Sequence, residues 1–187
     1  MTLFINACVR ETSRTKELSD CLLSKSDHPY EEVRLDTIDF PFVNEGFLEK
    51  RDRLIQDQDF NNPLFDLARQ FAAAEDIIIA APYWDLSFPA SLKQYIEQIN
   101  VVGITFVYTP EGIPAGLCKA RRLTYIMTAG GNFVPEEYGP GYVRSLAQNF
   151  YGIPEFKLIK AIGLDVDGAN IDSIMNIAKA DMESGTC

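Results

Sequence analysis

The segment Asp76-Ile-Ile-Ile-Ala-Ala-Pro82 is a continuous run of β-branched and small apolar residues that ends at a proline. Such a run is typical of a strand buried on both faces of a parallel sheet, because helices then cover both sides of the sheet. Proline cannot donate to the hydrogen-bond ladder, so we expect the strand to end at Pro82. The segment therefore predicts the central strand of an α/β fold.

Strand and helix patterns alternate on both sides of this segment. Strand patterns occupy residues 3–7, 30–35, 76–82, 122–127 and 156–162. Helical patterns occupy residues 15–24, 63–74, 89–98, 142–151 and 171–182. The polar residues 44–62 indicate an excursion over the surface, and residues 105–116 a small hairpin. This alternation predicts one doubly wound domain, residues 1–187, with a parallel sheet covered by helices on both faces.

Composition narrows the class of protein. No apolar run approaches the roughly 20 residues that a membrane span requires. The amino terminus has no basic stretch before an apolar segment, so we expect no export signal and a soluble, cytoplasmic protein. The net charge of −10 would repel a phosphate backbone, so we expect no nucleic-acid partner.

Cysteine and histidine give no sign of a disulfide framework or a metal site. The four cysteines, Cys8, Cys21, Cys118 and Cys187, form no C-x-x-C pair, so we expect reduced thiols. The single histidine, His28, has no cysteine or carboxylate cluster at ligand spacing and is expected in a solvated loop. No metal is therefore predicted.

In a doubly wound parallel sheet, ligands bind at the carboxyl ends of the strands, where the winding direction reverses. The loops after the first, third and fourth strands are therefore the candidate site. The first loop is Cys8-Val-Arg-Glu-Thr-Ser-Arg-Thr15. Backbone N–H groups and the helix dipole favour an anion at the following helix start. Its side chains fit a phosphate: Arg10, Ser13, Arg14 and Thr15. The alternative is that Thr12 or Ser13 only caps the helix.

The second and third loops suit a flat ring. Ala81-Pro-Tyr-Trp-Asp-Leu-Ser-Phe-Pro89 places two aromatic residues and a carboxylate directly after the buried strand. A flavin needs backbone donors near its pyrimidine edge and N5, apolar contact and one open face, and residues 83–86 can supply these. Thr128-Ala-Gly-Gly-Asn-Phe133 lets backbone approach a ring edge at its two glycines. The alternatives are a packed turn for the second loop and an ordinary tight turn for the third.

The stretch Ala81-Pro-Tyr-Trp-Asp-Leu-Ser-Phe-Pro-Ala-Ser-Leu-Lys-Gln-Tyr-Ile resembles the flavin loop and helix of FMN-dependent NADH azoreductases and NAD(P)H quinone oxidoreductases. Gly103 to Tyr108, Gly112, Gly116-Leu117 and Thr128 to Gly131 resemble further segments of that family, in order along nearly the whole chain. The resemblance implies a flavodoxin-like fold of strand order 2-1-3-4-5. It also implies an enzyme that uses FMN to pass electrons from NAD(P)H to a small planar acceptor such as a quinone or an azo compound.

The same resemblance assigns residues to the cofactor. It implies that the phosphate is held by Arg10, Ser13, Arg14 and Thr15. It implies contacts with the ring from Pro82, Tyr83, Trp84, Asp85 and Leu86, and contacts with its pyrimidine side from Thr128, Ala129, Gly130, Gly131 and Asn132. Members of the family are similar in forming homodimers, in which aromatic residues of the partner roof the pocket. The candidates for that roof are Phe106, Tyr108, Phe133 and Tyr151.

The sequence departs from the family pattern at two places. Asp85 stands where the azoreductase branch commonly has asparagine, so an amide donor is replaced by a carboxylate. Arg10 and Arg14 stand in a loop that is mostly uncharged in azoreductases.

Two alternative functions remain open at this point. Cys8, five residues and Arg14 match the spacing of a low-molecular-weight phosphatase loop, in which a thiolate attacks phosphorus. No Asp-Pro pair is present to supply the general acid of such an enzyme. The second alternative is a non-catalytic flavodoxin-type electron carrier, which would share the acidic charge and the FMN. A third motif, residues 165–170, has its glycine at the wrong position for a calcium loop and indicates a turn and a helix cap.

Overall fold

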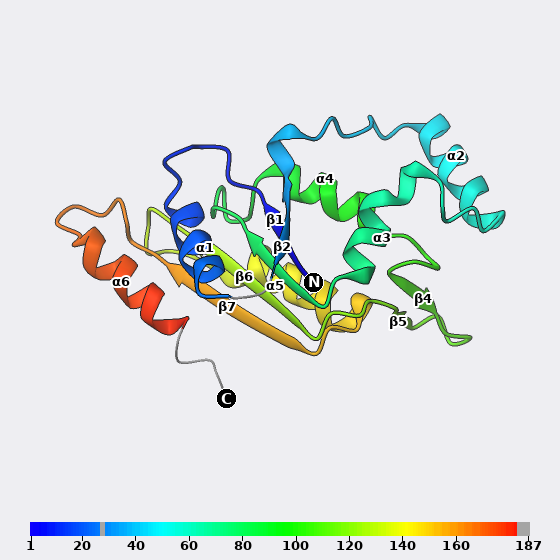
Figure 1. The fold of residues 1–187 in the computed structure, drawn as a ribbon. Helices are drawn as coiled ribbons and strands as arrows, with labels where there is room; N and C mark the ends of the chain where they lie inside the picture. Colours follow the sequence, from blue (N-terminus) through cyan, green and yellow to red (C-terminus); the bar gives the residue numbers. More distant parts are fainter. Residues whose placement is uncertain (27–28, 183–187) are drawn as a thin grey trace.

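The computed structural model describes residues 1–26 and 29–182, and its centre is a five-stranded parallel sheet (Figure 1). The strands follow the spatial order β2-β1-β3-β6-β7. Their bounds are Thr2–Asn6 for β1, Tyr30–Arg34 for β2, Asp76–Ala80 for β3, Arg122–Thr128 for β6 and Glu155–Ala161 for β7. The predicted order 2-1-3-4-5 is confirmed, because β6 and β7 are the fourth and fifth strands of this sheet.

Six α-helices connect or flank these strands within the described residues. They are α1 Arg14–Ser24, α2 Glu45–Gln56, α3 Asp66–Ala73, α4 Ala90–Ile99, α5 Pro140–Leu146 and α6 Ile171–Asp181. A two-stranded antiparallel hairpin, β4 Phe106–Tyr108 with β5 Pro114–Gly116, follows α4 as predicted. It projects from the molecule on the side away from α1 and α6 (Figure 1).

The two faces of the sheet carry separate cores because successive side chains of a strand point to opposite faces. Leu3, Ile5, Ile77 and Ile79 pack with α3, α4 and α5. Phe4 and Ile78 point the other way and pack with Leu18 of α1 and Met175 of α6. Both faces of β1 and β3 are therefore dry, as the apolar run at 76–82 predicts.

Two predicted elements differ from the structure. Residues 44–62 contain the helix α2, which begins at the cap Asn44 and carries no buried residue. Leu54 and Ile55 only partly pack, against a small cluster around Phe65 and Val101, so the apolar signal of this helix is weak. The predicted helix 142–151 begins earlier, at Pro140, and its last five residues form a π-helix, Ala147–Tyr151.

The structure was searched for membrane-spanning helices and for clusters of metal ligands. Within the described ranges, no helix is long and apolar enough to cross a membrane. Among the same residues, no group of three or more His, Cys, Asp or Glu side chains could hold a metal ion. His28 and Cys187 lie outside the described residues, whereas Cys8, Cys21 and Cys118 are free thiols.

Candidate functional site

A cleft with a volume of about 630 Å³ lies at the carboxyl ends of the parallel strands. Its position agrees with the winding of the sheet, because the chain turns to β2 on one side of β1 and to β3 on the other. Three predicted loops line it together. The lining residues are Val9, Arg10, Thr12, Ser13, Arg14, Thr15, Pro82, Tyr83, Trp84, Asp85, Thr128, Ala129, Gly130, Leu164 and Asp165.

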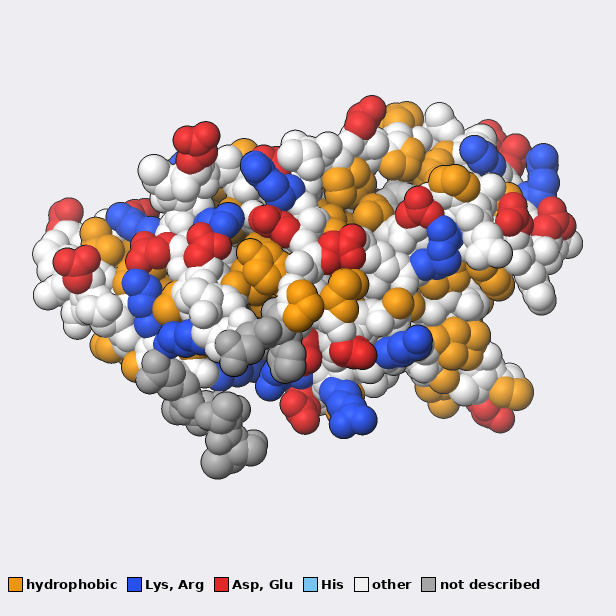
Figure 2. Space-filling model, viewed as in Figure 1, with side chains coloured by type: hydrophobic (Ala, Val, Ile, Leu, Met, Phe, Trp, Pro, Cys, Tyr) orange, Lys and Arg blue, Asp and Glu red, His pale blue; other side chains and the backbone are white. Residues whose placement is uncertain are grey.

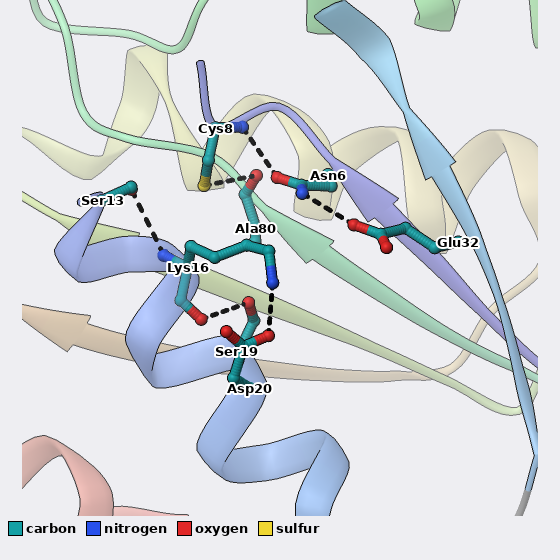
Figure 3. A network of polar contacts seen from close by, with 8 residues as sticks. All are labelled: Asn6, Cys8, Ser13, Lys16, Ser19, Asp20, Glu32 and Ala80. Atoms are coloured by element: carbon teal, nitrogen blue, oxygen red, sulfur yellow. Dashed lines mark hydrogen bonds and ion pairs between the residues drawn. The ribbon is translucent and has the colours of Figure 1, made fainter. Parts of the chain in front are cut away.

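The first loop ends in a capped helix whose leading amides are unused. Ser13 is the N-cap of α1, and its Oγ accepts a hydrogen bond from the Lys16 amide at 3.3 Å (Figure 3). Among the described residues, the amides of Arg14 and Thr15 donate to no protein acceptor. Orphan amides at a helix start bind anions well. The cap that was the alternative interpretation of Ser13 is therefore real, and it leaves two donors for a ligand.

Thr15 fixes the helix start against the third loop. Its side chain is fully buried, and its hydroxyl lies 2.7 Å from the hydroxyl of Thr128. Because either hydroxyl can donate, the pair can keep one proton free for a ligand at the cleft. The contact joins two loops that are 113 residues apart in sequence.

The second loop contains a tight turn with an unusual backbone. Trp84 and Ser87 exchange backbone hydrogen bonds of 3.1 and 2.8 Å. The two residues between them, Asp85 and Leu86, have φ of 50° and 67°, as in a type I′ turn. Aspartate tolerates this region, but leucine adopts it rarely and at a cost. Within the described chain, the amides of Asp85 and Leu86 have no protein acceptor, and that of Asp85, which lines the cleft, is available to a ligand.

Two side chains of the second loop attach it to residues 133–139. The Tyr83 hydroxyl donates to the Pro135 carbonyl at 2.8 Å, and the Ser87 hydroxyl donates to the Tyr138 carbonyl at 2.8 Å. Partial burial, together with Glu137 and Tyr138 nearby, raises the pKa of Tyr83. Tyr83 therefore stays a neutral donor at neutral pH, and the turn is held from its outer side.

The third loop is joined to the loop after β7 by consecutive backbone bonds. Amides of Gly163, Leu164 and Asp165 donate to the carbonyls of Gly131, Ala129 and Gly130 at 3.0, 3.2 and 2.9 Å. These bonds bring Leu164 and Asp165 into the cleft wall. A Cβ on Gly130 would lie 2.3 Å from Asp165 Oδ2, so the absence of a side chain there makes room for the carboxylate.

Cys8 lies beside the cleft but has the wrong environment for a nucleophile. It is 5% exposed, and its thiol points to the Ala80 carbonyl at 3.8 Å (Figure 3). Burial raises the pKa of Cys8 to about 11, whereas an attacking thiolate requires a lowered pKa. Its amide is bonded to Asn6 Oδ1 at 2.9 Å. The predicted burial of Cys8 is confirmed, although β1 ends two residues earlier, at Asn6. The geometry disfavours a phosphatase.

The structure brings most of the predicted residues together and leaves some apart. Eleven of the predicted cofactor residues line the cleft, whereas Leu86, Gly131 and Asn132 lie next to it in sequence without lining it. Phe106 and Tyr108 lie in β4, outside the lining. Phe106 is buried against Phe150 of its own chain. Sequence analysis missed Val9, Thr12, Leu164 and Asp165 as lining residues.

The sheet order and a cleft that combines a helix start with a glycine-containing loop define a flavodoxin-like protein. A family model described as flavodoxin-like fold matches residues 1–184. The chain is 39% identical over 181 residues to the FMN-dependent NADH:quinone oxidoreductase of Clostridium perfringens, covering 91% of this chain and 89% of the relative. The chain belongs to the flavodoxin-like family that contains these oxidoreductases.

Solved structures show the same fold. An azoreductase from Bacillus anthracis str. Sterne superposes with a TM-score of 0.85 at 22% identity, covering 98% of this chain and 96% of that one. An FMN-dependent NADH-azoreductase from Bacillus anthracis str. Ames Ancestor, in complex with FMN, gives a TM-score of 0.82 at 23% identity, covering 98% and 95%.

Proposed function

We propose that this chain is an FMN-dependent NAD(P)H oxidoreductase that passes electrons to a quinone, an azo compound or a similar small planar acceptor. The observation that carries the proposal is that one cleft joins an anion-binding helix start, a turn with free backbone donors and a glycine loop. The 39% identity to an FMN-dependent NADH:quinone oxidoreductase supports the same conclusion.

The donor set of the cleft fits FMN. Two arginines, two hydroxyls and two unused amides face the phosphate end, which suits a dianion. The volume of about 630 Å³ lies within the range of about 300–1,000 Å³ that is usual for ligand sites. Bound FMN would supply the redox chemistry, accepting hydride from NAD(P)H and returning two electrons to the acceptor.

The protein residues then act by binding and orientation. Arg10, Ser13, Arg14 and Thr15 would hold the phosphate. The residues assigned to the ring are Pro82, Tyr83, Trp84, Asp85 and Leu86, and those assigned to its pyrimidine side are Thr128, Ala129, Gly130, Gly131 and Asn132. Backbone donors of the second and third loops would stabilise negative charge on the reduced ring. Trp84 is 40% exposed, so its indole can border the slot where donor and acceptor bind in turn.

The test is anaerobic reduction of the FMN-saturated protein by NADH and by NADPH, followed at the visible flavin band. We expect rapid bleaching by at least one nucleotide, reversal by a quinone, and no change in a Cys8→Ser variant. FMN that binds but is not bleached would instead favour the electron carrier. A protein that binds no flavin but hydrolyses phosphate esters with Cys8 would overturn the proposal in favour of the phosphatase.

We also propose a homodimer as the functional state. Apolar side chains are exposed on the segment that leads to α2 and on the β4–β5 hairpin (Figure 2). On these two segments, the most exposed apolar side chains are Phe42, Ile113 and Tyr108, at 83%, 61% and 53%. Exposed apolar groups of this kind are usual at interaction surfaces. Light scattering after size-exclusion chromatography should give twice the mass of 21.0 kDa, and a Phe42→Asp, Ile113→Asp variant should lower it. A wild-type monomer would contradict the dimer.

A further inference from the structure

Arg14 already has an anionic partner at the rim of the cleft, which a ligand at Arg14 would have to displace or share. Its Nη1 lies 2.9 Å from Asp165 Oδ1. Both residues line the cleft, and the pair connects the first turn of α1 to the loop after β7, 151 residues later. Across the described residues, Arg10 forms no such ion pair, so the two arginines of the first loop are not equivalent.

The position of Asp165 is fixed by its backbone and by Gly130. The Asp165 amide donates to the Gly130 carbonyl at 2.9 Å, and the carboxylate occupies the space that a side chain at position 130 would need. The loop therefore holds a negative charge in the wall of a cleft whose other charged groups include Arg10 and Arg14. A phosphate that approaches Arg14 meets this carboxylate as a competitor of the same charge.

We propose that Asp165 competes with the ligand phosphate for Arg14. This competition weakens phosphate binding and so reduces the preference of the cleft for FMN over riboflavin. The inference rests on the proposed FMN function. When the phosphate binds, Arg14 must leave Asp165 or be shared with it. A flavin without a phosphate avoids this cost. Asp165 therefore narrows the difference in affinity between FMN and riboflavin.

The expected magnitude follows from exposure. The Arg14 and Asp165 side chains are 37% and 72% exposed, and ion pairs at such sites change equilibria by at most about fivefold. Asp165→Asn should therefore bind FMN about two- to fivefold more tightly at low salt. The gain should shrink as salt screens the charges over a Debye length of about 8 Å at physiological ionic strength.

The test compares affinities for FMN and riboflavin, measured by quenching of flavin fluorescence, in four variants and the wild type. Asp167→Asn is the matched control, because it removes the same charge from the same loop at an exposed residue that does not line the cleft. The other variants are Asp165→Asn, Arg14→Gln and the double variant. We expect Asp165→Asn alone to tighten FMN binding, with riboflavin affinity unchanged and no gain when Arg14 is also replaced.

Four results would overturn the inference. These are an FMN affinity of Asp165→Asn equal to that of Asp167→Asn, weaker FMN binding, an equal gain for riboflavin, or a gain that persists in the Arg14→Gln background. Weaker binding would instead make Asp165 a positioning residue for Arg14. If the wild-type protein binds neither flavin, both the proposed function and this inference are wrong. If it binds flavin but Asp165→Asn has no effect, only this inference is wrong.

Discussion

The two ends of the sheet each carry a charged cleft, but they differ in the state of the backbone. The cleft at the carboxyl ends has a volume of about 630 Å³, and one at the amino ends of β3, β6 and β7 has about 510 Å³. Charged residues form the whole lining of the second cleft: Glu75, Asp76, Lys119, Arg121, Arg122 and Glu155. Size and charge therefore do not distinguish the two.

Unused backbone donors do distinguish them. At the amino end, the amides of Lys119, Arg121 and Glu155 donate to the carbonyls of Ala72, Glu75 and Arg121. At the carboxyl end, four amides of α1 and of the Trp84–Ser87 turn have no acceptor in the described chain. A ligand at the amino end would have to break existing bonds, whereas one at the carboxyl end satisfies groups that the fold leaves open. Substitutions at the two ends of the sheet test this difference through their effects on flavin binding.

The largest effect is expected from removing the hydroxyls at the helix start. Bonds to charged groups contribute about 1.5–3 kcal/mol each, so a Ser13→Ala, Thr15→Ala variant should bind FMN at least about 100-fold more weakly. The control is Asn44→Ala, which removes the cap bond of Asn44 to Phe47 at the start of α2. It should lower stability by about 1 kcal/mol and leave the FMN dissociation constant unchanged. Unchanged FMN affinity in the Ser13→Ala, Thr15→Ala variant would show that these two hydroxyls do not bind the phosphate.

An intermediate effect is expected from the arginine at the carboxyl end, and none from its counterpart at the amino end. Arg14 pairs with Asp165 at 2.9 Å, and Arg122 pairs with Asp76 at 3.2 Å. Both pairs are exposed, so each contributes about 0–1 kcal/mol to stability. Arg14→Gln should weaken FMN binding about tenfold through loss of one charged contact, whereas Arg122→Gln should not change it. Equal losses measured by fluorescence titration would show that net charge, not the site, controls affinity.

A smaller effect is expected from relaxing the strained turn. Leu86 and Leu117 are both 43% exposed, but only Leu86 has a positive φ. Leu86→Gly should raise the free energy of unfolding by about 0.5–1 kcal/mol, because glycine adopts this φ without strain. Leu117→Gly should lower it by a similar amount. A looser turn should also weaken FMN binding about threefold. The free energy of unfolding is measured by urea denaturation. A lower value for Leu86→Gly than for the wild type would show that the backbone at Leu86 is not strained.

The sequence predicted the sheet because burial on two faces leaves a local signal. Residues 76–82 are apolar without alternation, and the loops after strands one, three and four follow from the topology alone. Asp165 left no such signal, because backbone bonds between residues 163–165 and 129–131 bring it to the cleft. Ligands of a doubly wound sheet bind at the carboxyl ends of its strands. The same reasoning applied to the loop after the fifth strand would have identified Asp165 as a candidate. The helix α2 was missed because it buries no side chain.

The contacts of Phe106 show a different limit of sequence analysis. An aromatic strand residue can roof a neighbour's pocket or fill its own core, and its pattern is the same in both cases. Phe106 is 5% exposed and packs edge-on against Phe150, with ring centroids 5.0 Å apart. Tyr108, two residues later, is 53% exposed. Only tertiary packing separates these two, so Tyr108 is the better candidate for contact with a partner.

No effect on flavin binding is expected from the buried thiol of Cys8, beside the cleft, or from the partly buried thiol of Cys118. Burial raises the pKa of Cys8 to about 11 and that of Cys118, beside the hairpin, to about 12. Both thiols therefore stay protonated at neutral pH. Cys8→Ser should retain the wild-type FMN affinity and the wild-type rate of NAD(P)H oxidation from pH 6 to 9. A loss of rate that follows thiol ionisation would return Cys8 to the chemistry.

The same pKa shift gives Cys8 a measurable effect on stability at alkaline pH. The folded pKa lies above the unfolded value of 9.0, so the folded state binds the extra proton, and stability falls as pH rises from about 9 to about 11. The loss should be about 2–3 kcal/mol, and Cys8→Ser should lack it. Urea denaturation of both proteins at pH 8 and pH 10.5 measures the difference. Parallel losses would mean that Cys8 is solvated, and the end of β1 would then be open to the cleft.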